Sequence, residues 1–221
     1  MDAVTYFTEA RQIALANAIQ NDDVNRVKEL ARSGVDVNAR GDQGMSFVLW
    51  AMGHRRKSAL RTLLECGANP NIRDDSGTAV IELAAKDEDP DYLRILLAAR
   101  GDPNQKNHLG EPLIFTPITE MRWLNMRVLA EKGADINAKG NDGSTPMIRL
   151  AGLNQFEEVM WLLDRGADFK SASDTGATLA WRVQRSRVNP GSPQAGWRDR
   201  VKKYLESTGV KFPVPAPTPP K

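Results

Sequence analysis

The chain contains 221 residues, of which 41% are hydrophobic and 26% are charged, and its formal net charge is +2. This balance is typical of a soluble protein and excludes disorder for the body of the chain. No apolar run reaches the length of about 18 residues that a membrane-spanning helix needs, and the single cysteine, Cys66, excludes an intramolecular disulfide.

Residues 5–38 are predicted to form an N-terminal capping unit of two helices. The Asn21-Asp22-Asp23 stretch predicts the break between them and supplies a capping side chain for a second helix over Val24–Ser33. Apolar residues of the first helix follow helical spacing: Ile13, Ala14, Ala18 and Ile19.

A strict period of 33 residues follows and predicts four internal repeats, at 39–71, 72–104, 105–137 and 138–170. A period of roughly 20–50 residues is typical of a solenoid, in which each unit buries its apolar face against its neighbours. Second helices are expected to end at Gly34, Gly67, Arg100, Gly133 and Gly166, because a left-handed residue there ends a helix. In three sets of residues, successive members lie 33 positions apart: Gly44, Gly77, Gly110, Gly143 and Gly176; Asp36, Asn69, Asp102, Asp135 and Asp168; Leu30, Leu63, Leu96, Leu129 and Leu162.

The third of these repeats is irregular. Pro117 lies where a helix is expected, and a proline there removes a backbone hydrogen bond, so it should kink or shorten that helix. Gly152 should weaken the corresponding helix of the next repeat.

The C-terminal part is predicted to be a capping repeat over 171–211, with an insertion at 189–196 and helices near Thr178–Val188 and Trp197–Ser207. Residues 212–221 are rich in proline and are expected to form an extended, flexible tail. Charge is uneven. Residues 176–211 carry eight basic and two acidic side chains, whereas residues 1–175 carry 21 basic and 26 acidic ones.

The repeat ends resemble the ankyrin segment G-A-D-x-N, as in Gly133-Ala134-Asp135-Ile136-Asn137. Gly143-Ser144-Thr145-Pro146-Met147 resembles the start of the ankyrin repeat, although the histidine of that motif is absent throughout. The resemblance covers roughly residues 10–210. It implies an all-α ankyrin-repeat solenoid of about six helix-turn-helix units with capped ends, over residues 1–211. It also implies a protein-binding scaffold.

Catalysis and cofactors are not expected. The two histidines, His54 and His108, lie in different repeats, and no common catalytic motif is present. The stretch Asp87-Glu88-Asp89-Pro90-Asp91 has the spacing of a calcium loop but lacks its glycine and final glutamate. Helix capping by Asp89, with Pro90 in the first turn, explains this stretch without a metal. The basic C-terminal residues show no nucleic-acid-binding motif.

Candidate partner-binding residues come from the loop tips and the inner helices, which form the concave face of this fold. Trp123 and Phe156 lie 33 residues apart and are expected side by side, with their aromatic rings available as interface anchors. Acidic tips should steer a basic partner. The complete predicted set is Asp42, Met45, His54, Asp75, His108, Glu111, Glu120, Trp123, Asp142 and Phe156.

A looser resemblance, at residues 7–51, is to bacterial ankyrin proteins encoded beside lipase effectors of type VI secretion. It implies an immunity protein that binds and inhibits a toxic phospholipase. The location would be periplasmic if a signal peptide has been removed, and cytoplasmic otherwise. Alternatives are a generic ankyrin adaptor, a secreted effector that binds a host protein, and a sensor of small molecules or ions.

Overall fold

The computed structural model of the protein describes residues 2–218, and the chain divides into two compact units, 1–109 and 110–221. The boundary falls inside the predicted repeat 105–137. The described residues contain helices and no β-strand, so the predicted all-α class is confirmed. Helices of the first unit are α1 (Ala3–Tyr6), α2 (Ala10–Gln20), α3 (Val24–Arg32), the short 3₁₀ helix η1 (Asp42–Gly44), α4 (Phe47–Gly53), α5 (Lys57–Glu65), α6 (Val80–Lys86) and α7 (Pro90–Ala98). Those of the second are α8 (Phe115–Thr119), α9 (Trp123–Glu131), α10 (Pro146–Gly152), α11 (Phe156–Leu163), α12 (Leu179–Arg185) and α13 (Pro193–Ser207).

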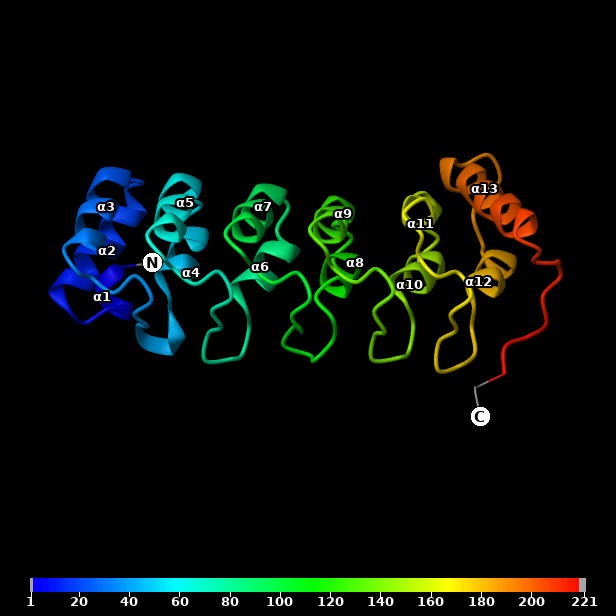
Figure 1. Cartoon of the computed structure of the whole chain (residues 1–221), viewed down its shortest axis with the longest axis horizontal. Coiled ribbons are helices and arrows are strands. Elements are labelled where there is room, and N and C mark those ends of the chain that lie inside the picture. The colour runs from blue at the N-terminus through cyan, green and yellow to red at the C-terminus, as the bar shows by residue number, and fades with distance from the viewer. Residues whose placement is uncertain (1, 219–221) are drawn as a thin grey trace. The chain divides into compact units, whose positions relative to one another are not determined.

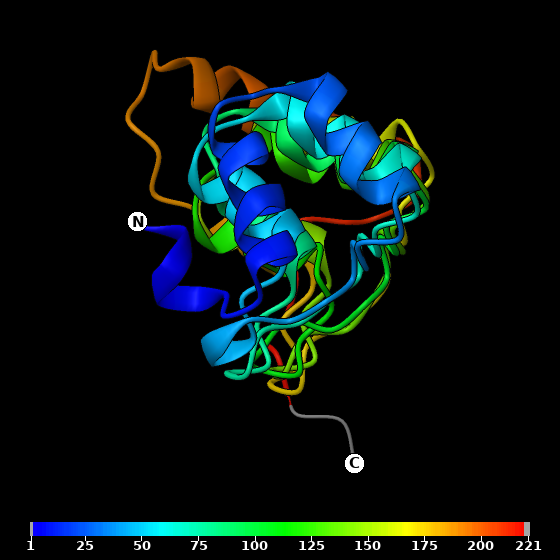
Figure 2. The same cartoon turned by 90° about the vertical axis from the view of Figure 1, so that its left-hand side faces the viewer.

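The first unit is a row of helical hairpins, each made of one inner and one outer helix. The pairs α2–α3, α4–α5 and α6–α7 follow one another in Figure 1, with α3, α5 and α7 as the outer helices. Helix α3 packs on α5, and α5 packs on α7. Long loops join the hairpins, and the loop that carries η1 extends away from α2 and α3 on the lower side of Figure 2.

The second unit repeats the same plan with α8–α9, α10–α11 and α12–α13. Helix α10 contacts both α8 and α12, and α11 packs on α13. Helix α8 has only five residues and contains Pro117, so the predicted shortening is confirmed. Proline has no N–H for the helical ladder, which explains why this inner helix is the shortest of the unit.

The outer helices α3, α5, α7, α9 and α11 end two or three residues before the predicted positions, and each predicted residue has the positive φ that stops the helix from continuing. Gly133 has φ 93°, a left-handed conformation in which a β-carbon would be strained. Arg100 takes the same conformation, with φ 68°, although it is not a glycine. Leu63, Leu96 and Leu129 are completely buried, as the period requires.

The recurring Asp or Asn has a structural role in the loops. Asn69 accepts a hydrogen bond from the backbone N–H of Asn71 at 2.9 Å, which forms a local turn. Asn71 in turn accepts from the backbone N–H of Asp102, at 2.7 Å, in the following loop. Asn38 binds Asn69 in the same way, also at 2.7 Å. The side chains therefore link successive loops of the first unit.

The C-terminal region differs from the prediction in two respects. Helix α13 begins at Pro193 instead of near Trp197, because Ser192 caps it and proline is tolerated in a first turn. The second half of the predicted insertion 189–196 is thus helical. The tail is extended, but it also contacts α12, since Gln184 and the backbone of Val214 exchange two hydrogen bonds of 2.7 and 3.0 Å. The tail (red in Figure 1) runs beside α12; its residues 219–221 lie outside the described residues.

Candidate interaction surface

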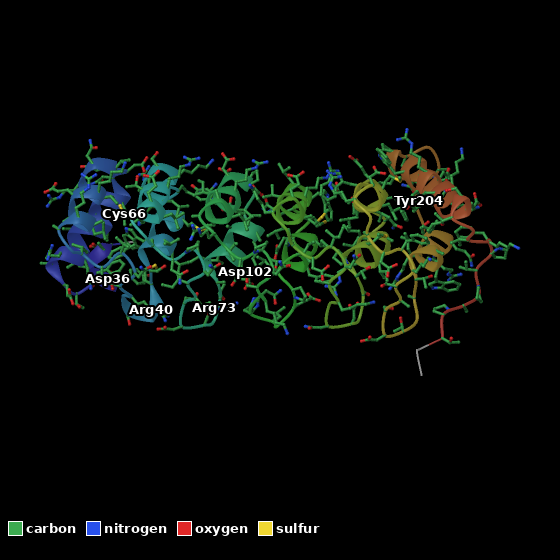
Figure 3. The ribbon with its side chains drawn as sticks, viewed as in Figure 1. Asp36, Arg40, Cys66, Arg73, Asp102 and Tyr204 are labelled. Carbon is green, nitrogen blue, oxygen red and sulfur yellow. The ribbon has the colours of Figure 1, made fainter. Side chains whose placement is uncertain are left out.

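The loop tips of the first unit are joined by hydrogen bonds and ion pairs. Arg40 binds the carboxylate of Asp75 at 2.7 Å. Arg73 donates to the backbone carbonyl of Lys106 at 2.6 Å, and Figure 3 shows Arg40 and Arg73 at successive loops. The predicted site residue Asp75 therefore has a cationic partner within the protein. Asp42 is exposed at the neighbouring tip.

A buried carboxylate lies behind these loops. The Glu82 side chain is fully buried and accepts hydrogen bonds from the backbone N–H of His108, at 2.8 Å, and from Lys86, at 2.9 Å. The ring nitrogen Nδ1 of His108 also lies within hydrogen-bond distance. Burial opposes ionisation of Glu82, but these donors outweigh it and lower its pKa. The predicted site residue His108 thus anchors its own loop to α6.

The acidic stretch 87–91 contacts basic groups of the preceding repeat. Asp89 caps α7 by accepting from the backbone N–H of Asp91, and Pro90 occupies the first turn, as predicted. Arg55 pairs with Asp87, and Lys57 lies 2.6 Å from Asp89 and 2.9 Å from Asp91. Hydrogen bonds from Lys57 lower the pKa of both Asp89 and Asp91. These carboxylates therefore stabilise the junction of two repeats.

The remaining predicted residues of the first unit are Met45 and His54, and both are half-buried. The His54 ring packs on Trp50 with centroids 4.4 Å apart, and burial lowers the pKa of His54. Trp50 in turn donates from its indole N–H to the carbonyl of Ala16 at 2.8 Å. His54 belongs to an aromatic cluster that seals the N-terminal end.

In the second unit, Arg149 brings two predicted site residues together. Its guanidinium lies 2.9 Å from Glu111 and 2.8 Å from Asp142, and it stacks over the Phe115 ring at 4.4 Å. Glu111 is buried, and its carboxylate also accepts from the backbone N–H of Asn141 at 3.1 Å. Burial opposes ionisation of Asp142, whereas hydrogen bonds from Ser144 and Arg149 lower its pKa. Glu111 is thus a buried structural carboxylate.

The expected aromatic pair is not exposed as a pair. Phe156 has 0% of its surface exposed, so its ring is unavailable to a partner, and that prediction is wrong. Gln194 from α13 accepts from the backbone N–H of Phe156 at 2.8 Å, which shows how the C-terminal helix covers the start of α11. Gln194 belongs both to the predicted insertion 189–196 and to the first turn of α13, and a repeat period cannot reveal the cover that it provides. Trp123 is half-buried, and Glu120 is exposed.

A group of exposed apolar residues lies beside Trp123. Met121 is 66% exposed at the turn between α8 and α9, and Leu124 is 51% exposed in the first turn of α9. Leu153 is 45% exposed at the corresponding turn between α10 and α11. We call Met121, Leu124 and Leu153 the apolar hairpin edge. Large exposed apolar side chains on neighbouring hairpins are typical of interaction sites.

No group of three or more His, Cys, Asp or Glu side chains that could hold a metal occurs among residues 2–218. Within the same residues, no helix is long and apolar enough to span a bilayer.

No protein-family model matches the sequence, and no curated protein matches it. Among solved structures, the ankyrin repeat domain of Bcl-3, a member of the IkappaB protein family, matches with a TM-score of 0.70 and 21% identity. The match covers 90% of this chain and 86% of that one. The fold is that of ankyrin repeats. An ankyrin repeat domain from Acinetobacter baumannii AYE matches with a TM-score of 0.70 and 23% identity, over 89% of this chain and 98% of that one.

The apolar hairpin edge was not predicted from the sequence, because the ankyrin resemblance directs attention to a different surface. Most predicted site residues lie at the loop tips and on the inner helices, where ankyrin arrays present their concave face, and only Trp123 and Phe156 lie at the starts of outer helices. Met121 and Leu153 lie at the hairpin turns, at the opposite ends of the inner helices, and Leu124 lies in the first turn of α9. The available signal was hydrophobicity at turn positions, since the equivalent turns of the first unit carry Arg55 and Glu88.

Proposed function

We propose that this protein is a non-catalytic scaffold that binds another protein, and that the apolar hairpin edge of the second unit contributes to the interface. The observation that carries the proposal is the exposure of Met121, Leu124 and Leu153 on adjacent ankyrin hairpins. Exposing such side chains to water is unfavourable, and burying them against a partner removes that cost. Trp123 lies between Met121 and Leu124 in sequence and adds a half-buried aromatic ring.

For the partner, we propose a secreted phospholipase whose toxicity this protein neutralises. Support comes from the resemblance of residues 7–51 to bacterial ankyrin immunity proteins. The second-unit edge would then bind the enzyme, and the acidic tips would contribute less than charge counting suggests. The charge of Asp75 is largely offset by Arg40, whereas Asp142 shares Arg149 with Glu111, and that group keeps one net negative charge.

The test is co-expression of the protein with a phospholipase encoded by a neighbouring gene and exported to the periplasm. Survival of the cells and co-elution of the two proteins from a sizing column are expected. Continued killing without a complex would remove the immunity role. A generic adaptor or a host-directed effector would then be the remaining explanations.

Matched variants locate the interface. Met121→Ser combined with Leu124→Ser should weaken the complex by at least about tenfold, because exposed apolar anchors supply much of the affinity. Val4→Ser is the control, since Val4 is 61% exposed in the first unit. Equal affinity of both variants and the parent would place the interface elsewhere. Phe156→Ala is unsuitable as a probe, because emptying a buried phenylalanine costs about 3–5 kcal/mol of folding stability.

A further inference from the structure

Arg182 occupies the same position in its repeat as Arg149 does in the preceding one, 33 residues earlier. The positions that supply Arg149 with carboxylates are Glu111 and Asp142. One repeat later, these positions hold Ser144 and Thr175. Arg182 has therefore lost both acidic partners that its position has in the neighbouring repeat.

The surroundings of Arg182 form a recess of about 230 Å³ in the second unit. The guanidinium lies over Gly152, where an added β-carbon would come within 3.9 Å of it. Its Nε atom is buried and has no hydrogen-bond partner. Such a donor is costly to leave unsatisfied, so the recess is suited to an acceptor from outside. The other lining residues are Ala151, Asn154, Arg185, Ser186 and Arg187.

Charge in the recess is of one sign. Within the described part of the chain, no carboxylate lies within ion-pair distance of Arg182, Arg185 or Arg187. Three arginines beside one another repel, and an oxyanion between them relieves that repulsion while accepting charge-assisted hydrogen bonds. Asn154 also lines the recess, and its amide group can supply a further donor.

We propose that this arginine recess binds a carboxylate side chain from an acidic segment of the protein partner. The proposal rests on the protein-binding function above and adds the chemistry of the partner. Gly152 and Asn154 line the recess, and Leu153 of the apolar hairpin edge lies between them. The recess is therefore adjacent along the chain to one residue of the edge, Leu153. A segment with apolar residues followed by Asp or Glu fits this combination, whereas a free phosphate would use the recess alone.

The experiment uses the full-length protein and a capped tetraglutamate peptide, with capped tetraglutamine and inorganic phosphate as comparison ligands. Titration is followed by NMR at the side-chain Nε–H of Arg182, which reports contact at the recess itself. The Arg182→Gln variant removes one charge from the recess. Lys203→Gln removes one charge from an exposed position on α13 and is the matched control.

Binding of tetraglutamate should shift the Arg182 Nε–H signal, and tetraglutamine should not. Arg182→Gln should lower the affinity by about tenfold, the effect of losing a bidentate charge-assisted contact, and Lys203→Gln by less than about twofold. An unmoved Arg182 signal would overturn the proposal, as would equal losses in both variants. A shift with phosphate alone would replace it with a small-anion site.

Wild-type titration needs no variant, so a folding defect in Arg182→Gln leaves the test intact. The peptide assay is also independent of the phospholipase. A negative result with the peptide overturns the proposal that the recess binds a carboxylate, and it leaves the proposal of a protein-binding scaffold unaffected. A failed co-expression test removes the immunity role without altering the peptide result.

Discussion

Arg149 and Arg182 are equivalent residues of consecutive ankyrin repeats, yet their environments differ completely. Arg149 binds Glu111 and Asp142 and stacks on Phe115. Arg182 has no carboxylate partner among the described residues and directs its guanidinium over Gly152. A repeat fixes the position of the backbone, while the residues around that position decide whether an arginine stabilises the array or remains available to a ligand. Charge counting alone cannot separate these two cases.

The largest expected difference is in folding stability. Arg149→Ala leaves the buried carboxylate of Glu111 without its cation, and breaking a buried pair in this way costs about 3–5 kcal/mol. Arg182→Ala removes no internal partner and should change the free energy of unfolding by less than about 1 kcal/mol. Urea titration followed by tryptophan fluorescence measures both. Comparable losses in the two variants would show that Arg182 has a structural role.

Periodicity made the helices predictable because burial enforces it. Leu63, Leu96 and Leu129 must all be buried between hairpins, and any slip in register would expose them. Residues at helix ends were equally predictable, since Asp89 and Pro90 suit only the start of α7. The start of α13 was not predictable from the period, because the insertion before it occurs in only one repeat and has no equivalent elsewhere in the chain.

Site residues were harder to predict because equivalence in the repeat does not imply equal exposure. Phe156 and Trp123 share a register, but Gln194 and its helix cover only the start of α11. Glu111 was predicted to bind a partner and is instead buried beside Arg149. Both outcomes depend on side chains from other repeats, which a single repeat sequence does not contain.

The buried carboxylate of Glu82, in the first unit, can be compared with an exposed one by measuring how folding stability depends on pH. Hydrogen bonds from Lys86 and His108 lower the pKa of Glu82 below the unfolded value of about 4.3. Ionised Glu82 therefore contributes stability above that pH, and the contribution is lost as pH falls through the lowered folded pKa. Glu82→Gln should cost about 1.5–3 kcal/mol at pH 7, where it weakens charge-assisted hydrogen bonds.

The check is the difference in unfolding free energy between the parent and Glu82→Gln, measured from pH 7 to pH 3. This difference should narrow below about pH 4. Asp102→Asn is the control, because Asp102 is exposed and its side-chain oxygen accepts from the backbone N–H of Asn104 in either form. A constant difference for Glu82→Gln across the range would show that its charge does not contribute.

A double-mutant cycle tests whether Glu111 is the residue that makes Arg149 indispensable. Adding Glu111→Ala to Arg149→Ala removes the stranded carboxylate, so part of the loss should be recovered. The coupling energy should be about 0.5–3 kcal/mol, the usual range for contacting residues. Additive losses would instead indicate that the Arg149 guanidinium contributes mainly through its packing on Phe115.

The smallest effect should come from giving Arg182 the partner that it lacks. Thr175 holds the position of Asp142, and it is exposed. In Thr175→Asp, the new carboxylate takes the position of Asp142, which accepts from the backbone N–H of Ser144 at 3.1 Å; the equivalent N–H, that of Ala177, already donates to the Ser173 hydroxyl at 3.2 Å. To pair with the new carboxylate, the Arg182 guanidinium would have to turn away from Gly152 and toward the loop. Stability should rise by about 0.2–1 kcal/mol, and the gain should shrink in high salt, as expected for a surface pair. The same variant should bind tetraglutamate less tightly, since its own carboxylate competes for the guanidinium. Increased stability with unchanged peptide affinity would show that the recess acts without Arg182, and that Arg185 and Arg187 should be examined instead.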